Sequence, residues 1–134
     1  MFKRFAAVAA LALCLGGLTS PAFAGSPHFV GTPTATVSGD TVSVSGKEAG
    51  LGNEAQIHVV VTADAACINP GDQHPEAANK ESFNAEGTFP VQNGKADFSL
   101  TVTAVFQPPC APPMTVQWSN IVVTDAANGL SATL

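Results

Sequence analysis

A strict alternation of apolar and polar residues in short runs constrains the fold of this chain more than any other feature. The clearest run spans residues 95–103, and its apolar members are Ala96, Phe98, Leu100 and Val102. Similar runs cover residues 41–45 and 56–62. Side chains of a β-strand point alternately to the two faces of a sheet, so these runs predict half-buried strands. Val60 breaks the second run, and we expect that strand to be covered on both faces or to lie at an interface.

Turn residues separate the runs at short intervals. Asn93-Gly94 is the strongest of these signals, because both central residues of the favoured hairpin turn need a positive φ. Gly39-Asp40 and Asn128-Gly129 predict two further reversals of the chain. The apolar phase slips by one residue at Ser119-Asn120, which predicts a β-bulge or a boundary between two strands.

About seven or eight short strands joined by such turns predict an antiparallel β-sandwich of the immunoglobulin-like or a related Greek-key type. Helix signals are scarce, and the one candidate, Pro75 to Glu81, is too short to be stable without tertiary support. The longest segment without a strand pattern lies between Cys67 and Glu86. Because no repeat or long linker divides the chain, we expect a single sandwich domain over residues 25–134.

Residues 1–24 have the features of an export signal that is removed from the mature protein. Lys3 and Arg4 precede an apolar run from Phe5 to Leu18, and Ala22-Phe23-Ala24 places small residues at the positions that a signal peptidase reads. The run has about 14 residues, fewer than the roughly 20 that span a bilayer, so we expect no membrane insertion. The protein is therefore expected to be secreted and extracellular.

Removal of the signal changes both the charge and the number of thiols. It takes 24 of the 134 residues and leaves 110, with three lysines against ten acidic residues and a formal net charge of −7. Nucleic acids and anionic lipids bind clustered lysine and arginine, which this mature chain lacks, so neither is an expected partner. Cys14 leaves with the signal, and only Cys67 and Cys110 remain.

In an oxidising compartment these two thiols predict one disulfide, Cys67–Cys110. Both cysteines lie beside turns that contain proline or glycine, so we expect the bridge near one end of the sandwich. Closing a loop of about 43 residues stabilises the fold by roughly 4 kcal/mol in the chain-entropy model. The chain has no C-x-x-C spacing, so a redox or metal-binding role for the pair is not expected.

The segment after Cys67 is the candidate binding loop, because loops of this length in compact domains are often functional. Its candidate binding residues are Asn69, Asp72, His74, Glu76, Asn79 and Lys80. Their oxygen atoms could coordinate calcium, but their order matches no calcium-loop spacing. We prefer a solvated acidic loop with local turns. The three histidines lack the spacing of a local chelate, so we expect no metal and no cofactor.

Residue patterns for catalysis are missing from the sequence. There is no G-x-S-x-G or H-E-x-x-H motif, and a disulfide leaves no cysteine nucleophile. The mature part has one tryptophan and five phenylalanines, most of which the core needs, so an aromatic-lined glycosidase cleft is not expected. Trp118 alternates in phase with Met114 and Val116, which favours a core position over an exposed stacking platform for a sugar. We therefore expect a non-catalytic protein.

Several segments carry a family resemblance. They are Ala49–Gly52, Ile57–Thr62, Cys67–Gly71, Pro75–Glu81, Gly87–Pro90, Asn93-Gly94 and Thr124–Gly129. Together they resemble a family of small secreted microbial proteins of unknown function, over most of the mature chain, and this resemblance implies no activity. In size, acidity and residues 33–37 and 42–51, the chain also resembles the apoproteins of neocarzinostatin-type chromoproteins. Those have two short-range disulfides where this sequence allows one long-range bridge, so their ligand cleft is not implied.

These observations favour a monomeric extracellular module that binds an unidentified ligand or protein, or interacts with a cell surface. A small-ligand carrier of the chromoprotein type is the first alternative. A protease inhibitor is the second, because Gln107 to Met114 forms a stiff, proline-rich loop tethered by Cys110, and preorganisation lowers the entropic cost of binding.

Overall fold

A computed structural model describes residues 26–71 and 80–134, so the expected export signal lies outside the described residues. Eight strands follow one another over these described residues. They are β1 (His28–Phe29), β2 (Thr34–Ser38), β3 (Thr41–Ala49), β4 (Gln56–Ile68), β5 (Lys80–Pro90), β6 (Ala96–Thr103), β7 (Thr115–Asp125) and β8 (Leu130–Thr133). One short 3₁₀ turn, η3 (Ala126–Asn128), connects β7 to β8.

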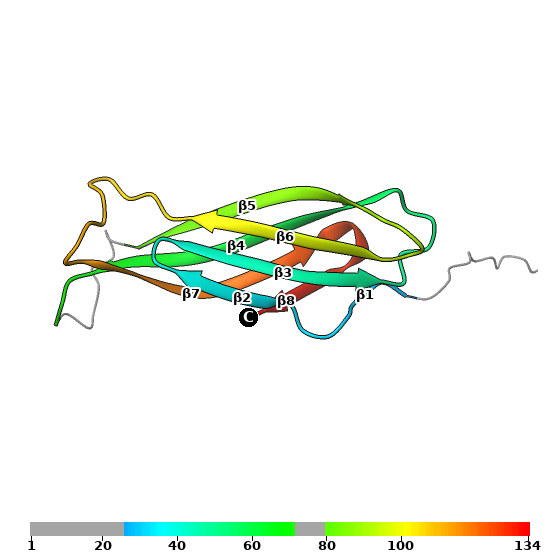
Figure 1. Cartoon of the computed structure of the whole chain (residues 1–134), viewed down its shortest axis with the longest axis horizontal. Helices are drawn as coiled ribbons and strands as arrows, with labels where there is room; N and C mark the ends of the chain where they lie inside the picture. Colours follow the sequence, from blue (N-terminus) through cyan, green and yellow to red (C-terminus); the bar gives the residue numbers. More distant parts are fainter. Residues whose placement is uncertain (1–25, 72–79) are drawn as a thin grey trace, which may run out of the picture.

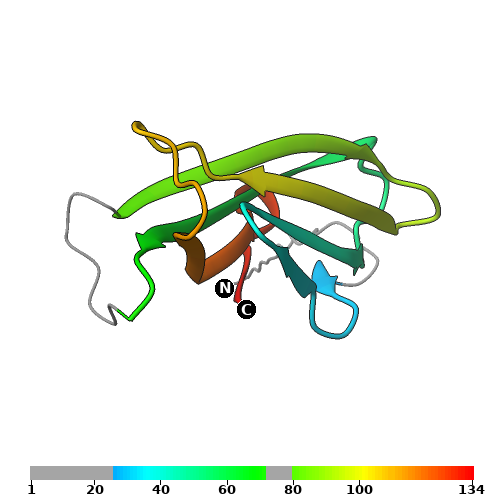
Figure 2. The ribbon, with the colours of Figure 1, turned by 60° about the vertical axis from the view of Figure 1, so that its left-hand side comes forward.

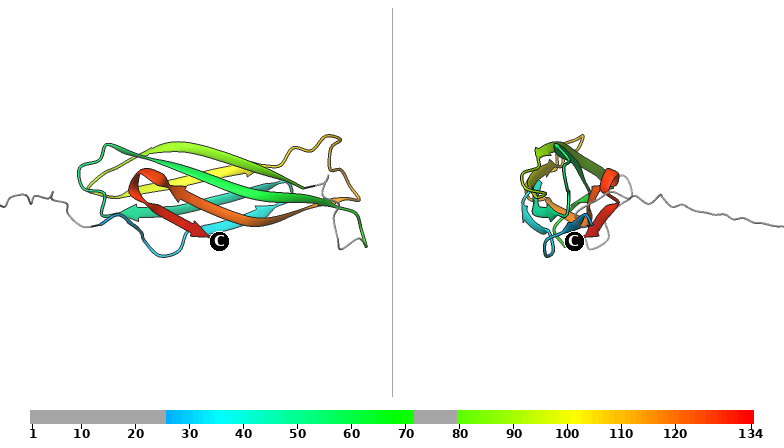
Figure 3. Two further views of the ribbon diagram at one scale, coloured as in Figure 1. Left: turned by 180° about the vertical axis from the view of Figure 1, so that it is seen from behind. Right: turned by 90° about the vertical axis from the view of Figure 1, so that its right-hand side faces the viewer.

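The strands form two four-stranded antiparallel sheets, which confirms the predicted β-sandwich (Figures 1 and 2). In the first sheet β3 is central, because it pairs with β6 along one edge and with β1 and β2 along the other. The second sheet has the order β5-β4-β7-β8. The end-on view in Figure 3 shows the strands enclosing a single interior. Over residues 26–71 and 80–134, no helix combines the length and hydrophobicity needed to cross a membrane.

The core consists of the inward residues that the alternation predicts. Its fully buried members include Val42, Val44, Ile57, Val59, Val61, Val102 and Val123. Full burial of each such side chain is worth about 1.5–3 kcal/mol, so these residues supply much of the force that holds the two sheets together. Val60 points outward from β4 between Glu86 and Thr124 of the flanking strands and is half-buried. Its neighbours in the sheet cover it in part.

The predicted hairpin turns are all present. Asn93 and Gly94 have φ values of 55° and 75° and reverse the chain between the paired residues Gln92 and Lys95. Gly39, with a φ of 58°, closes the β2–β3 hairpin. Gly129, with a φ of 70°, ends η3 and starts the return along β8.

The predicted bulge is also confirmed, within a single strand. The register of β7 against β4 shifts between Thr62 and Asp64, and Asn120 has a φ of 49°. The side-chain amide of Asn120 donates to Asp64 Oδ2 at 2.9 Å, and the Ser82 hydroxyl donates to Asp64 Oδ1. Both bonds lower the pKa of Asp64 because they favour its charged form. One carboxylate therefore joins three strands at the bulge.

The expectation of a patternless segment up to Glu86 is wrong for residues 80–86. These residues form the first part of β5, which pairs with β4 from Lys80 opposite Ala66 onward. The inward residues of β5 are Phe83, Ala85, Gly87 and Phe89, a true alternation that its small members disguise. The helix candidate Pro75 to Glu81 is likewise wrong at Lys80 and Glu81, and its other residues lie outside the described part.

Trp118 is half-buried and packs against the core, in the inward phase that the sequence predicts. Its ring lies 6.4 Å from that of Phe83, between centroids, and contacts both the central core and a smaller cluster around Cys67. Its indole Nε1 donates to the backbone oxygen of Gly39 at 3.1 Å. Trp118 thereby ties β7 of one sheet to the β2–β3 turn of the other.

We expect Trp118→Phe to lower the free energy of unfolding by about 1 kcal/mol, because the variant keeps a ring beside Phe83 but loses the hydrogen bond to Gly39. Urea unfolding followed by circular dichroism measures this difference without the tryptophan signal. A variant as stable as the wild type would contradict a stabilising role for this bond.

Candidate functional site

The connecting loops gather at two ends of the elongated sandwich (Figures 1 and 3). The disulfide end contains the β2–β3 turn, residues 69–71 after β4 and the β6–β7 connection, residues 104–114. The opposite end, here called the acidic end, contains the β3–β4 loop, the β5–β6 hairpin and η3. Each end carries a feature that the packing of the core does not require.

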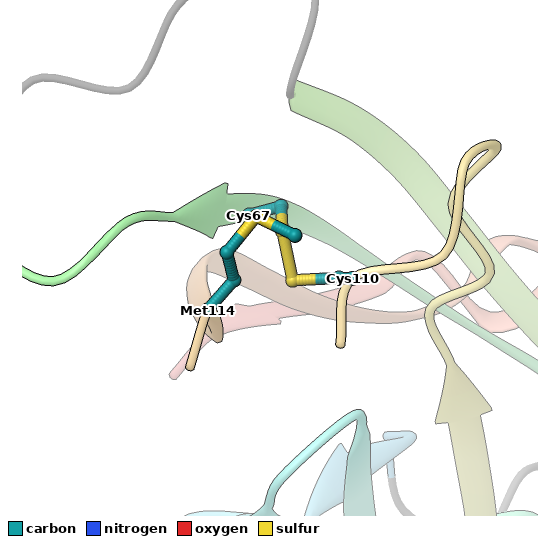
Figure 4. Close-up of a disulfide and its surroundings, with 3 residues drawn as sticks. All are labelled: Cys67, Cys110 and Met114. Atoms are coloured by element: carbon teal, nitrogen blue, oxygen red, sulfur yellow. A yellow bond between two sulfur atoms is a disulfide. The ribbon is translucent and has the colours of Figure 1, made fainter. Parts of the chain in front are cut away.

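The predicted disulfide is confirmed at the first of these ends. Cys67, near the end of β4, is bonded to Cys110 at an S–S distance of 2.01 Å and a sequence separation of 43 residues (Figure 4). The sulfur of Met114 lies 3.7 Å from that of Cys67. Because Cys67 pairs with Val116 of β7, the bridge ties the β6–β7 connection to the two inner strands of the second sheet, β4 and β7, at the disulfide end.

Three inward side chains, one buried and two half-buried, anchor the β6–β7 connection at its start, middle and end. Phe106 is 7% exposed and packs edge-on against Phe83, with 5.6 Å between ring centroids. Cys110 and Met114 supply the second and third anchors, and both pack against the cluster around Cys67. Between the anchors, the chain exposes Gln107, Pro108, Pro109, Ala111, Pro112 and Pro113.

This proline loop, residues 107–113, carries no charge. No Asp, Glu, Lys, Arg or His occurs from Phe98 to Thr124, in a chain with ten acidic residues elsewhere. Val105, immediately before the loop's first anchor, is 61% exposed. An exposed, apolar and pre-shaped surface in an acidic protein is the kind of surface that marks an interaction site.

The predicted binding loop is only partly described. Asn69 and Lys80 lie at its two ends, and both side chains are exposed near the disulfide bridge. Asp72, His74, Glu76 and Asn79 lie outside the described residues.

The two described histidines have separate partners, and neither belongs to the disulfide end. His28 Nδ1 is 2.8 Å from the backbone oxygen of Ser26, and His58 Nε2 is 2.9 Å from Glu86 Oε1 on the outer face of the second sheet. Within residues 26–71 and 80–134, no three His, Cys, Asp or Glu side chains are grouped closely enough to form a ready-made metal site.

The acidic end contains a cluster of acidic side chains in the interior. Glu48 of β3 and Asp125 of β7 are both 0% exposed. The side-chain nitrogen Nδ2 of Asn128 donates to Asp125 Oδ2 at 2.8 Å and to Glu54 Oε1 at 3.1 Å. Neither oxygen of Glu48 has a hydrogen-bond donor among the described residues. We call Glu48, Glu54, Asp125 and Asn128 the carboxyl cluster.

Burial makes the Glu48 carboxyl a much weaker acid than an ordinary glutamate side chain. Loss of hydration, a hydrogen bond to Asp125 and the negative charges of Asp125 and Glu54 raise its pKa to about 8 from an ordinary 4.5. At neutral pH the Glu48 carboxyl is therefore mostly protonated and can donate its proton to Asp125. A neutral acid next to a carboxylate avoids the cost of two buried like charges.

An open groove of about 560 Å³ lies beside this cluster. The β3–β4 loop forms one wall with Gly52, Asn53 and Glu54, and the β5–β6 hairpin forms the other with Asn93 and Lys95. Glu54 thus has contact with the groove and, through Asn128, with the buried Asp125. The groove gives solvent access to the edge of the cluster.

The sequence contained a signal for this cluster that the interpretation did not use. In β3 the inward phase set by Val42 and Val44 continues to Gly46 and Glu48. In β7 the phase after the bulge, set by Ile121 and Val123, continues to Asp125. An acidic residue in the apolar phase at each of two strand ends was therefore readable, although their proximity was not.

Comparison with known proteins adds no assignment, since no family model, curated protein or solved structure matches this chain.

We expect replacement of both Cys67 and Cys110 by alanine to lower the free energy of unfolding by about 4 kcal/mol, because the open chain gains entropy when unfolded. Urea unfolding of the protein that starts at residue 25 measures this loss. Thiol titration of the denatured, unreduced wild type should find no free thiol, and two reactive thiols would contradict the bridge.

We expect the stability of the protein in metal-free buffer to fall as the pH rises from 4.5 to about 8. In this window the unfolded chain releases the Glu48 proton while the folded protein retains it. Glu48→Gln removes this titration, so the variant should be more stable than the wild type at pH 8, by roughly 3 to 5 kcal/mol, and nearly equal to it at pH 4.

Urea unfolding at several pH values tests this, with Glu81→Gln as a matched control on an exposed strand position. Asp64 titrates in a separate window, because its lowered pKa removes stability only as the pH falls below the ordinary 3.8. Parallel pH profiles for the wild type and Glu48→Gln would contradict the buried, neutral carboxyl.

Proposed function

We propose that this protein is a secreted, non-catalytic binding module that presents the proline loop to an extracellular protein or cell-surface partner. The main supporting observation is the anchoring of this loop, whose exposed prolines lie between the buried Phe106 and the half-buried Cys110 and Met114. The export signal, the acidic mature chain and the expected immunoglobulin-like type of sandwich agree with such a role.

A pre-shaped loop favours recognition because little conformational entropy is lost when it binds. Proline fixes φ, and the disulfide and two further anchors restrict what movement remains. The absence of charge from Phe98 to Thr124 favours a partner with an apolar or aromatic groove over an ionic one. Proline-rich segments commonly dock into aromatic-lined grooves of other proteins.

The two alternative functions, a small-ligand carrier and a protease inhibitor, differ in how well the described features support them. A small-ligand carrier needs a concave, largely apolar pocket, whereas the grooves at the acidic end are open and lined by glycine, asparagine and charged residues. A protease inhibitor would use the same proline loop, and its stiffness supports that role as well as docking. We therefore place the inhibitor second and the carrier third.

The test is binding of the labelled protein, residues 25–134, to envelopes of the cells that secrete it. Ala111→Asp introduces a charge into the exposed proline loop and should lower binding at least tenfold, because the charge must be desolvated in the interface. Ala55→Asp is the matched control at the opposite end. Both alanines are exposed, and each accepts one backbone hydrogen bond that the substitution leaves in place.

Equal binding of Ala111→Asp and Ala55→Asp would contradict the proposed surface. Inhibition of a protease panel by the wild type and Ala55→Asp, but not by Ala111→Asp, would favour the inhibitor. A thermal shift with apolar small molecules that both variants retain would favour the carrier.

A further inference from the structure

We propose that the outer face of the first sheet binds the surface of an ice crystal through a grid of hydroxyl side chains. The three strands that supply them, β2, β3 and β6, lie side by side in Figure 1. This face is separate from the proline loop and from the carboxyl cluster. Its role is therefore independent of the function proposed for the loop.

Every outward position in the paired stretches of these three strands is a serine or a threonine. Eight of the nine side chains are exposed, and that of Thr41 is half-buried. Charged residues begin one row further along, where Lys47 lies opposite Asp97. We call the nine residues the hydroxyl face: Thr34, Thr36, Ser38, Thr41, Ser43, Ser45, Ser99, Thr101 and Thr103.

The strand register places these hydroxyls in three parallel rows. The middle row consists of Thr36, Ser43 and Thr101, one residue from each strand. Neighbouring strands lie about 4.7–4.9 Å apart, and alternate residues along a strand lie about 6.4–6.8 Å apart. Within the rows, Thr34 Oγ1 is 3.3 Å from Ser45 Oγ, and Ser43 Oγ is 3.1 Å from Thr101 Oγ1. The hydroxyl oxygens therefore repeat in two directions, and some are held in place by each other.

Ice is the ligand that this repeat favours. Each hydroxyl both donates and accepts, so the water molecules that it holds repeat with the grid. On the prism faces of hexagonal ice, oxygen atoms repeat at two perpendicular spacings close to those of the grid. The bound water molecules can therefore join the crystal. A dissolved ligand gains little from such hydroxyls, because each new hydrogen bond replaces one to water.

The lack of charged and aromatic side chains in the grid also distinguishes ice from other ligands. A charged group orients water around itself and would oppose a lattice of neutral molecules. The outer face of the second sheet, by contrast, contains the His58–Glu86 pair. Sugars need an aromatic ring on which to stack, and Trp118, the one tryptophan, packs against the core.

Growth of a single ice crystal in a solution of the protein, residues 25–134, tests this proposal. A protein that binds ice holds the freezing point below the melting point and gives the crystal flat facets. We expect both effects for the wild type and neither for serum albumin at the same mass concentration. Round crystals with equal freezing and melting points in the wild type would overturn the proposal.

Two substitutions in the middle row test the face itself. Thr101→Tyr should remove most of the gap between freezing and melting points, because the ring holds the neighbouring hydroxyls away from the crystal. Thr36→Tyr should do the same on an edge strand, and it keeps the test informative where Thr101→Tyr alters the fold. Thr88→Tyr is the matched control, exposed on β5 opposite His58, and should keep the full gap.

A full gap in both Thr36→Tyr and Thr101→Tyr would overturn the proposal, as would an equal loss in Thr88→Tyr. Ala111→Asp, the variant that tests the proline loop, should keep the full gap. The two proposals therefore fail separately.

Discussion

The alternation of β3 is the constraint on which the rest of the molecule depends. This strand is central in the first sheet, and its inward phase contains Val42, Val44, Gly46 and Glu48. The two valines are fully buried against the second sheet. At Gly46 a β-carbon would lie 2.7 Å from the ring of Phe98, so only glycine leaves room for that ring. A shift of one residue would expose all four positions at once.

The same phase gives the two ends of the sandwich different physical chemistry. At the disulfide end, hydrophobic anchors and a covalent bridge hold an uncharged loop in place. At the acidic end, β3 and β7 each place an acidic side chain in the interior. Loss of hydration is the largest cause of the raised pKa of the one on β3, Glu48. One end is thus suited to contact with a partner, and the other responds to protons.

Much of the fold could be predicted from the sequence because local chemistry determines it. Asn93-Gly94 and Gly39 need positive φ wherever they stand, and the slipped phase at Ser119-Asn120 could only be absorbed by a bulge or a break. The first part of β5 was missed because Ala85 and Gly87 contribute little apolar signal, and because pairing with β4 stabilises the strand. That pairing is a long-range property that no local pattern contains.

The candidate site was less predictable than the fold. The disulfide followed from counting thiols, but the anchoring of the proline loop by Phe106 depends on the approach of Phe83 from another strand. The carboxyl cluster unites residues from β3, the β3–β4 loop and the end of β7. Strand phase indicates that Glu48 and Asp125 point inward, whereas only the packing of the first sheet against the second brings them together.

The most direct test of this account is the ¹³C NMR titration of the Glu48 side-chain carboxyl in the protein that spans residues 25–134. Since the phase of β3 buries this group beside Asp125, we predict a midpoint near pH 8. A midpoint near the ordinary 4.5 would show that Glu48 is hydrated, and would contradict the strand phase from which both ends of the molecule are derived.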